Sequence, residues 1–181
     1  MTPDEVADVF GTMASAGVVA LVALPVLYVV SRSSSTALRV GLRGSGPALA
    51  GAIALVATAG SLWFSKGAHF PPCELCWYQR IAMYPLAVIL PIGAWRADAT
   101  VRSYGLALAG AGIAVSVWHN VIETFPSLDA GACDPTNPCT LRWVAGLGFW
   151  TIPRMAFVAF SLIIVILVLD SPEDSPESER P

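Results

Sequence analysis

Four cysteines form two closely spaced pairs in this 181-residue chain. Cys73 and Cys76 form a Cys-x-x-Cys motif, and Cys133 and Cys139 lie farther along in a polar segment. A Cys-x-x-Cys bridge stabilises little of a chain, because the effect of a disulfide grows with the length of the loop that it closes. The spacing suits thiol–disulfide exchange instead. The first pair therefore predicts redox chemistry, while the second pair fits redox exchange and a structural bridge equally well.

Two further side chains could act on a thiol. Arg80 follows Cys76 by four residues, so a helix would place both on one face, where the guanidinium favours a thiolate. The unpaired N–H groups of a helix that begins near Cys76 would act in the same direction. His119 is more simply interpreted as a buried structural histidine, although ionisable groups at membrane depth are often functional. Arg154 has no cysteine beside it and fits an interfacial arginine.

The elements that must position these residues are membrane helices. The chain is 55% hydrophobic and only 13% charged, and its net charge of −3 argues against nucleic-acid binding. Uncharged runs long enough to cross a bilayer, two of them with the help of an interfacial arginine, predict an all-α membrane protein. We expect helices at about residues 12–31, 47–64, 77–95, 104–121 and 151–169.

The charges flanking the first run predict the orientation of the chain. No Lys or Arg precedes this run, whereas Arg32, Arg39 and Arg43 follow it, which places the N-terminus outside and the 32–46 loop in the cytoplasm. All four cysteines then lie in outward-facing connections, on the side where disulfides persist. Four cysteines allow three pairings, of which the two local ones are the simplest. Residues 170–181, rich in Ser, Pro, Asp and Glu, are expected to be a disordered cytoplasmic tail.

Two segments carry a family resemblance. Residues 72–80, PCELCWYQR, resemble the Pro-Cys-x-Leu-Cys-x-Tyr-x-Arg signature of the DsbB family of membrane disulfide-bond formation proteins. Residues 119–127, HNVIETFPS, followed by Cys133-Asp134, resemble that family's approach to its second cysteine pair. The resemblance implies a four-helix bundle over residues 47–169. Residues 1–46 would add an extra N-terminal membrane helix and a loop.

The resemblance also implies a reaction, in the cytoplasmic membrane of a bacterium. Cys133 and Cys139 would take two electrons from a soluble, extracytoplasmic, DsbA-like thiol oxidase of thioredoxin fold. Cys73 and Cys76 would then pass the electrons to a membrane quinone, either ubiquinone or menaquinone. Cys76 and Arg80 would lie beside the quinone, and His119 would belong to the quinone site. No metal is implied.

Two features depart from the best-known members of the family, and two other functions are considered. The extra N-terminal span is one departure, and the short spacing of Cys133 and Cys139, as in the BdbC-like branch, is the other.

A vitamin K epoxide reductase-like enzyme also uses a quinone and two cysteine pairs, but its loop pair precedes the Cys-x-x-Cys motif. A zinc-binding membrane scaffold could use four cysteines, although Cys-x5-Cys is wide for such a site.

Overall fold

The computed structural model describes residues 2–30, 44–129, 131 and 133–170, and within them the fold is entirely helical. Its elements are α1 (Pro3–Val30), α3 (Gly46–Leu62), the π-helical turn η1 (Trp63–Gly67), α4 (Glu74–Trp95), α5 (Val101–Thr124), the 3₁₀ turn η2 (Pro126–Leu128) and α6 (Ile152–Leu169). Five helices in the described part of the chain are long and apolar enough to cross a membrane. The predicted all-α membrane fold is thus confirmed. Residues 31–43 and 171–181 lie outside the described residues, and with them most of the expected cytoplasmic loop and nearly all of the acidic tail.

The first helix begins at Pro3, nine residues before the start that the apolar run predicted. The Thr2 hydroxyl accepts a hydrogen bond from the Glu5 backbone N–H, and the Glu5 carboxylate accepts one from the Thr2 backbone nitrogen. This reciprocal arrangement is a capping box, and Pro at the first helical position is already suited to a helix start. The expected start at residue 12 was wrong. The cap at Thr2 allows the helix to begin in the more polar residues that precede the apolar run.

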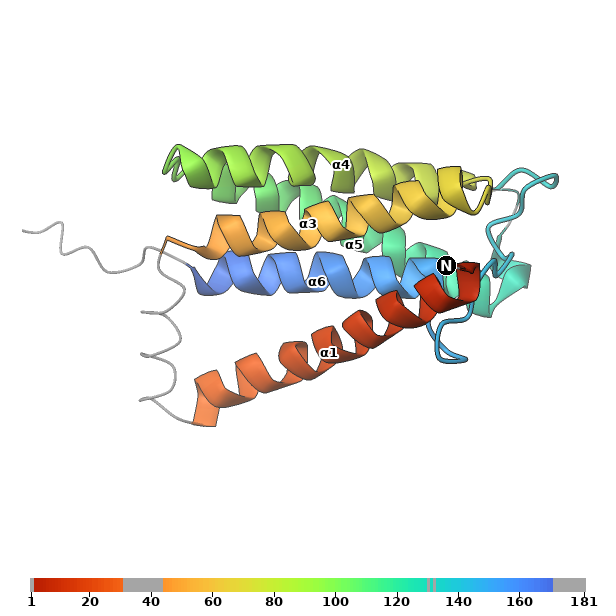
Figure 1. Ribbon diagram of the computed structural model, residues 1–181, viewed down its shortest axis with the longest axis horizontal. Coiled ribbons are helices and arrows are strands. Elements are labelled where there is room, and N and C mark those ends of the chain that lie inside the picture. Colours follow the sequence, from red (N-terminus) through yellow and green to blue (C-terminus); the bar gives the residue numbers. More distant parts are fainter. Residues whose placement is uncertain (1, 31–43, 130, 132, 171–181) are drawn as a thin grey trace, which may run out of the picture.

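The four helices α3 to α6 form a bundle, and α1 lies beside it (Figure 1). Small residues allow close approach inside the bundle, as is common between membrane helices. At Gly112 of α5, an added Cβ would come within 2.2 Å of the Phe160 ring on α6. The helix α1 packs mainly on α6, and its C-terminal part slants away from the bundle (Figure 1).

One end of the bundle gathers the segments that carry the cysteines. The start of α4, the end of α5, the 125–151 connection and the N-terminal end of α1 all lie there (Figure 1). The Asp8 carboxylate on α1 accepts a hydrogen bond from the Leu147 backbone N–H at 2.8 Å, so the contact between α1 and the connection is direct. The candidate site lies at this end.

Candidate functional site

The helix pair, Cys73 and Cys76, lies across the first turn of α4. Cys73 is the N-cap residue, and its sulfur accepts the Cys76 backbone N–H at 3.3 Å. Both cysteines are free thiols with their sulfurs 2.6 Å apart. Cys73 is buried, whereas Cys76 is half-buried. The two-residue spacing and the N-cap geometry together hold the sulfurs in contact, as thiol–disulfide exchange requires.

The loop pair, Cys133 and Cys139, is joined by a disulfide, which confirms one of the two local pairings expected from the sequence. Both residues are buried, and they pack in one cluster with Cys73 of the helix pair. The Asn137 side chain donates a hydrogen bond to the Pro72 carbonyl at 3.0 Å, which ties the loop to the residue just before Cys73. The structure therefore brings the oxidised loop pair against the reduced helix pair.

His119, near the C-terminal end of α5, lies between the two pairs. Its Nε2 atom is 3.1 Å from the Cys139 carbonyl oxygen and 3.8 Å from the Cys73 sulfur. Because a carbonyl oxygen can only accept, Nε2 carries the proton and donates it to Cys139. His119 is not among the residues that line the large apolar cavity described below. Its expected contact with a quinone stays a prediction.

The contacts around Cys73 favour its thiolate. The pKa of Cys73 falls from about 9 to about 5, mainly because the Cys76 thiol donates a hydrogen bond to its sulfur. Burial opposes this shift, while the hydrogen bond and the charge interaction with His119 support it. The sequence argument had placed the thiolate on Cys76. The hydrogen bonds in the structure instead lower the pKa of Cys73, because the N-cap sulfur is the atom that accepts them.

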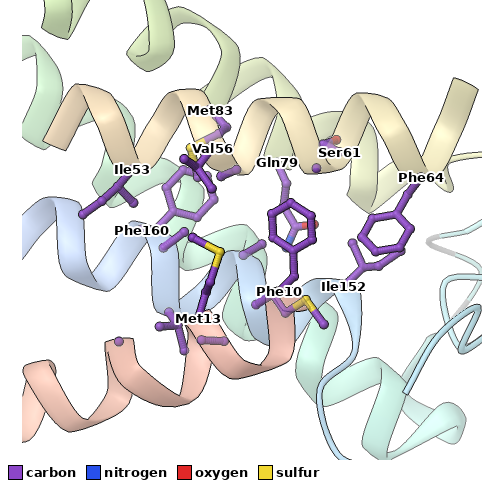
Figure 2. A pocket seen from close by; sticks show the side chains of 18 of the residues that line it. Phe10, Met13, Ile53, Val56, Ser61, Phe64, Gln79, Met83, Ile152 and Phe160 are labelled. Carbon is purple, nitrogen blue, oxygen red and sulfur yellow. The ribbon is translucent and has the colours of Figure 1, made fainter. Parts of the chain in front are cut away.

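Cys76 and Arg80 line the apolar cavity, which has a volume of about 560 Å³ and walls from α1, α3, α4 and α6. Apolar side chains fill most of the view in Figure 2, and Ser61 and Gln79 are polar exceptions. The Arg80 guanidinium donates to the Ser61 hydroxyl at 3.0 Å and to the Ser61 carbonyl at 3.1 Å. A mostly apolar cavity of this size with a few polar groups is typical of a small-molecule site.

Two ion pairs on a buried carboxylate, which were not predicted from the sequence, hold the connection that carries the loop pair. The Glu123 carboxylate, on a side chain only 2% exposed, lies 3.1 Å from Arg142 in the connection and 3.6 Å from Arg154 in α6. Arg154 therefore pairs with a carboxylate, and its interpretation as a simple interfacial arginine was incomplete. Glu123 lies two residues beyond the expected fourth span, which contains no acidic residue, and a carboxylate so close to a membrane helix was the available signal.

A four-cysteine zinc site is not formed in this structure, because Cys133 and Cys139 are joined to each other. Within the described residues, the sulfurs of Cys73 and Cys76 and a ring nitrogen of His119 lie within 4.8 Å of one another and could hold a metal ion. However, Nε2 of His119 carries a proton for the Cys139 carbonyl. Structural zinc sites almost always have four ligands, so the arrangement favours thiol chemistry over a zinc scaffold.

Comparison with known proteins gives a consistent result. Residues 45–169 match the family model described as "Disulfide bond formation protein DsbB". "Probable disulfide formation protein C 2" of Bacillus anthracis is 42% identical over 123 residues, which are 68% of this chain and 88% of that protein. "Disulfide bond formation protein C" of Bacillus subtilis is 42% identical over 124 residues, 68% of this chain and 90% of that protein. No solved structure gives a significant match.

Proposed function

This chain belongs to the DsbB family of disulfide bond formation proteins, and from that we propose that it transfers electrons from a soluble dithiol protein to a membrane quinone. The donor would be a DsbA-like protein of thioredoxin fold. The cysteine end of the bundle would face the extracytoplasmic side of a bacterial cytoplasmic membrane. The loop pair would receive the electrons, and the helix pair would pass them on.

The first step would oxidise the partner. A partner thiolate attacks one sulfur of the Cys133–Cys139 disulfide and displaces the other sulfur as a thiolate. The second partner thiol then attacks the mixed disulfide, so the partner leaves with a disulfide and the loop pair becomes a dithiol. Because both loop cysteines are buried, the loop must move to admit the partner.

The second step would transfer the electrons between the two pairs. A loop thiolate attacks the oxidised helix pair at Cys73, which packs against the loop pair, and displaces the Cys76 sulfur. Completion of the exchange re-forms the Cys133–Cys139 disulfide and leaves Cys73 and Cys76 as a dithiol.

The residues of the apolar cavity fit a quinone. In the displacement at Cys73, the leaving Cys76 thiolate would form on the cavity wall, where the Arg80 guanidinium one helical turn away offsets its charge. Ser61 holds that guanidinium in place. A quinone bound in the cavity would accept two electrons and two protons from the helix pair and become a quinol, while Cys73 and Cys76 return to a disulfide. The apolar walls would exclude water from the reacting thiol.

One observation carries the proposal. Cys73 and Cys76 both pack in the cluster that holds the loop disulfide, and Cys76 also lines the apolar cavity. The helix pair therefore contacts both the loop that a water-soluble donor can reach and a cavity suited to a lipid-soluble acceptor.

The test combines purified protein, a reduced thioredoxin-fold partner and a quinone whose absorbance is followed. We expect one quinone to be consumed per partner disulfide formed, and no consumption by Cys76→Ser. Partner oxidation without quinone consumption would contradict the proposal. So would purified protein that holds zinc tightly and has four free thiols.

A further inference from the structure

The apolar cavity has a wall that the family match does not include. Helix α1 lies wholly outside the matched residues 45–169, yet it contributes lining residues from Phe10 to Leu24. Phe10 and Met13 project from α1 toward side chains of the bundle (Figure 2). We propose that α1 holds the prenyl tail of the quinone and so sets the preference of this protein for tailed quinones. This inference rests on the proposed function above.

The length of the α1 wall indicates a tail rather than a ring. Phe10 and Leu24 are fourteen residues apart, which corresponds to roughly 21 Å along a helix. The reacting groups, Cys76 and Arg80, belong to α4 at the cysteine end of the bundle. A quinone ring beside Cys76 would leave most of this length free for an extended apolar chain.

The residues of α1 that line the cavity differ from those on its other faces. Met13, Gly17 and Ala20 follow one another at spacings of four and three residues, so they share one face of α1, and all three line the cavity. Val19 and Val22 lie on other faces and are 67% and 61% exposed, as side chains in contact with lipid would be. The residues of α1 that line the cavity therefore lie on a different face from Val19 and Val22, although Met13 in the lining is itself 49% exposed.

Specific contacts fix the N-terminal half of this wall to the connection that carries the loop pair. The Trp150 indole N–H donates to the Ser15 hydroxyl at 2.8 Å, and the Leu147 backbone N–H donates to Asp8 at 2.8 Å. Gly146 lies so close to the Ala7 carbonyl that an added Cβ would be 2.2 Å from its oxygen. A helix bound this closely can serve as a permanent wall of the site.

The test fills the cavity face of α1 and compares it with the lipid face. Ala20→Phe and the milder Ala16→Leu narrow the cavity, and Val19→Phe is the matched control on the exposed face. Equilibrium binding is measured by extraction of bound quinone, with a quinone bearing several isoprene units and with the same ring bearing a methyl group in place of the tail. Thermal unfolding in detergent shows whether each variant is folded.

We expect wild-type protein to bind the tailed quinone more tightly than the tail-less ring. Ala20→Phe should weaken binding of the tailed quinone at least tenfold, Ala16→Leu by less, and neither should alter binding of the tail-less ring more than twofold. Val19→Phe should leave both unchanged. Equal affinity of the wild type for both quinones, or equal effects of the Ala20 and Val19 variants, would overturn the inference and indicate that lipid occupies this part of the cavity. Failure of wild-type protein to bind or reduce either quinone would instead overturn the proposed function.

Discussion

Cys73 and Cys76 are separated by only two residues, yet their surroundings give them different chemical tasks. Both pack in the cluster that holds the loop disulfide, but the Cys73 sulfur accepts the Cys76 backbone N–H, whereas Cys76 also lies on the wall of an apolar cavity. Stabilising the Cys73 thiolate stabilises the reduced helix pair, which makes the oxidised helix pair a stronger oxidant. In the proposed relay, the hydrogen bonds to Cys73 would therefore favour electron transfer from the loop pair to the helix pair.

The lowered pKa of Cys73 predicts how its reactivity depends on pH. In reduced protein, alkylation of Cys73 should be half-maximal near pH 5 and should fall below that pH as the thiolate is protonated. His119→Phe removes the imidazole whose hydrogen-bonding and charge interactions lower the pKa of Cys73, so it should move the midpoint upward. Mass spectrometry of the alkylated Cys73 peptide measures the rate. A wild-type midpoint near 9, the ordinary value for a thiol, would show that the contacts do not stabilise the thiolate.

Replacement of Arg80 should separate the two ends of the electron path. Arg80→Met removes the charge beside Cys76 on the cavity wall, so quinone reduction should slow at least tenfold while exchange with the soluble dithiol changes less than threefold. Stopped-flow absorbance of the quinone and of the partner measures the two rates. Arg102→Met is the matched control, because Arg102 binds the Leu167 carbonyl at the other end of the bundle. Equal losses at both steps would remove the role given to Arg80.

The sequence could predict the cysteine pairs but not all of their neighbours. Short spacing brings Cys73 to Cys76 and Cys133 to Cys139 whatever the rest of the chain does. The contact between His119 and the Cys139 carbonyl depends on how a long connection folds back over α5. The depth of His119 in its helix could place it near Cys76, but no local pattern contains its contact with the loop, so that contact was not foreseen.

At the scale of the helices, the apolar runs predicted which segments are helical, but the predicted first residues of α1 and α4 were wrong. Hydrocarbon requires every backbone group of a span to be paired, so a long apolar run indicates a helix reliably. The ends depend on capping by polar side chains. α4 begins at Glu74, because Cys73 caps it, and not at residue 77 as expected, and α1 begins at Pro3 beside the Thr2 cap. The Thr-x-x-Glu pattern at Thr2 was the overlooked signal.

Two glycines of α5 provide a matched test of helix packing. Gly112→Ala would bring a methyl group into the Phe160 ring on α6 and should lower the free energy of unfolding by about 1–3 kcal/mol. Gly110→Ala places the same methyl where no atom lies within 4 Å and should leave stability unchanged or slightly higher. Thermal unfolding in detergent compares the two. Equal destabilisation would mean that α5 and α6 do not pack at Gly112.

The Glu123 ion pairs connect α5, the loop and α6, so their loss should affect the loop pair. Glu123→Gln removes the carboxylate that faces Arg142 and Arg154, at a cost of about 1–3 kcal/mol. The released loop should expose the disulfide, so we expect faster attack by the partner and slower transfer to the helix pair. Rapid quenching followed by thiol trapping resolves the two steps.

Asp134→Asn provides the control for that experiment. Asp134 is an exposed carboxylate in the same connection, and it bonds only to the nearby Thr136 among the described residues. Its replacement should leave both rates within twofold. Should the Glu123 and Asp134 variants behave alike, the ion pairs would have no part in holding the loop.

At the scale of the whole molecule, the extra helix α1 places the start of the chain at the same end of the bundle as the cysteines. Its N-terminal end binds the connection that carries the loop pair, through Asp8 and Leu147, so the start of the chain and the cysteines lie at one end of the bundle (Figure 1). The turn between α4 and α5 lies at the opposite end. The sequence could predict that the N-terminus and the cysteines share a side, because three arginines follow the first span. It could not predict the contacts between α1 and the connection, which depend on how the helices pack.

The orientation of this arrangement in the membrane is the last prediction. Asp4→Cys, Thr136→Cys and Asp98→Cys each introduce one exposed thiol into protein whose native cysteines are replaced by serine. In intact cells, a membrane-impermeant maleimide should label positions 4 and 136, whereas position 98 should react only after lysis. This outcome follows from the three arginines after the first span, which favour the cytoplasm. Labelling of position 98 alone would place the cysteines on the reducing side, where a quinone-linked disulfide relay could not supply disulfides to exported proteins.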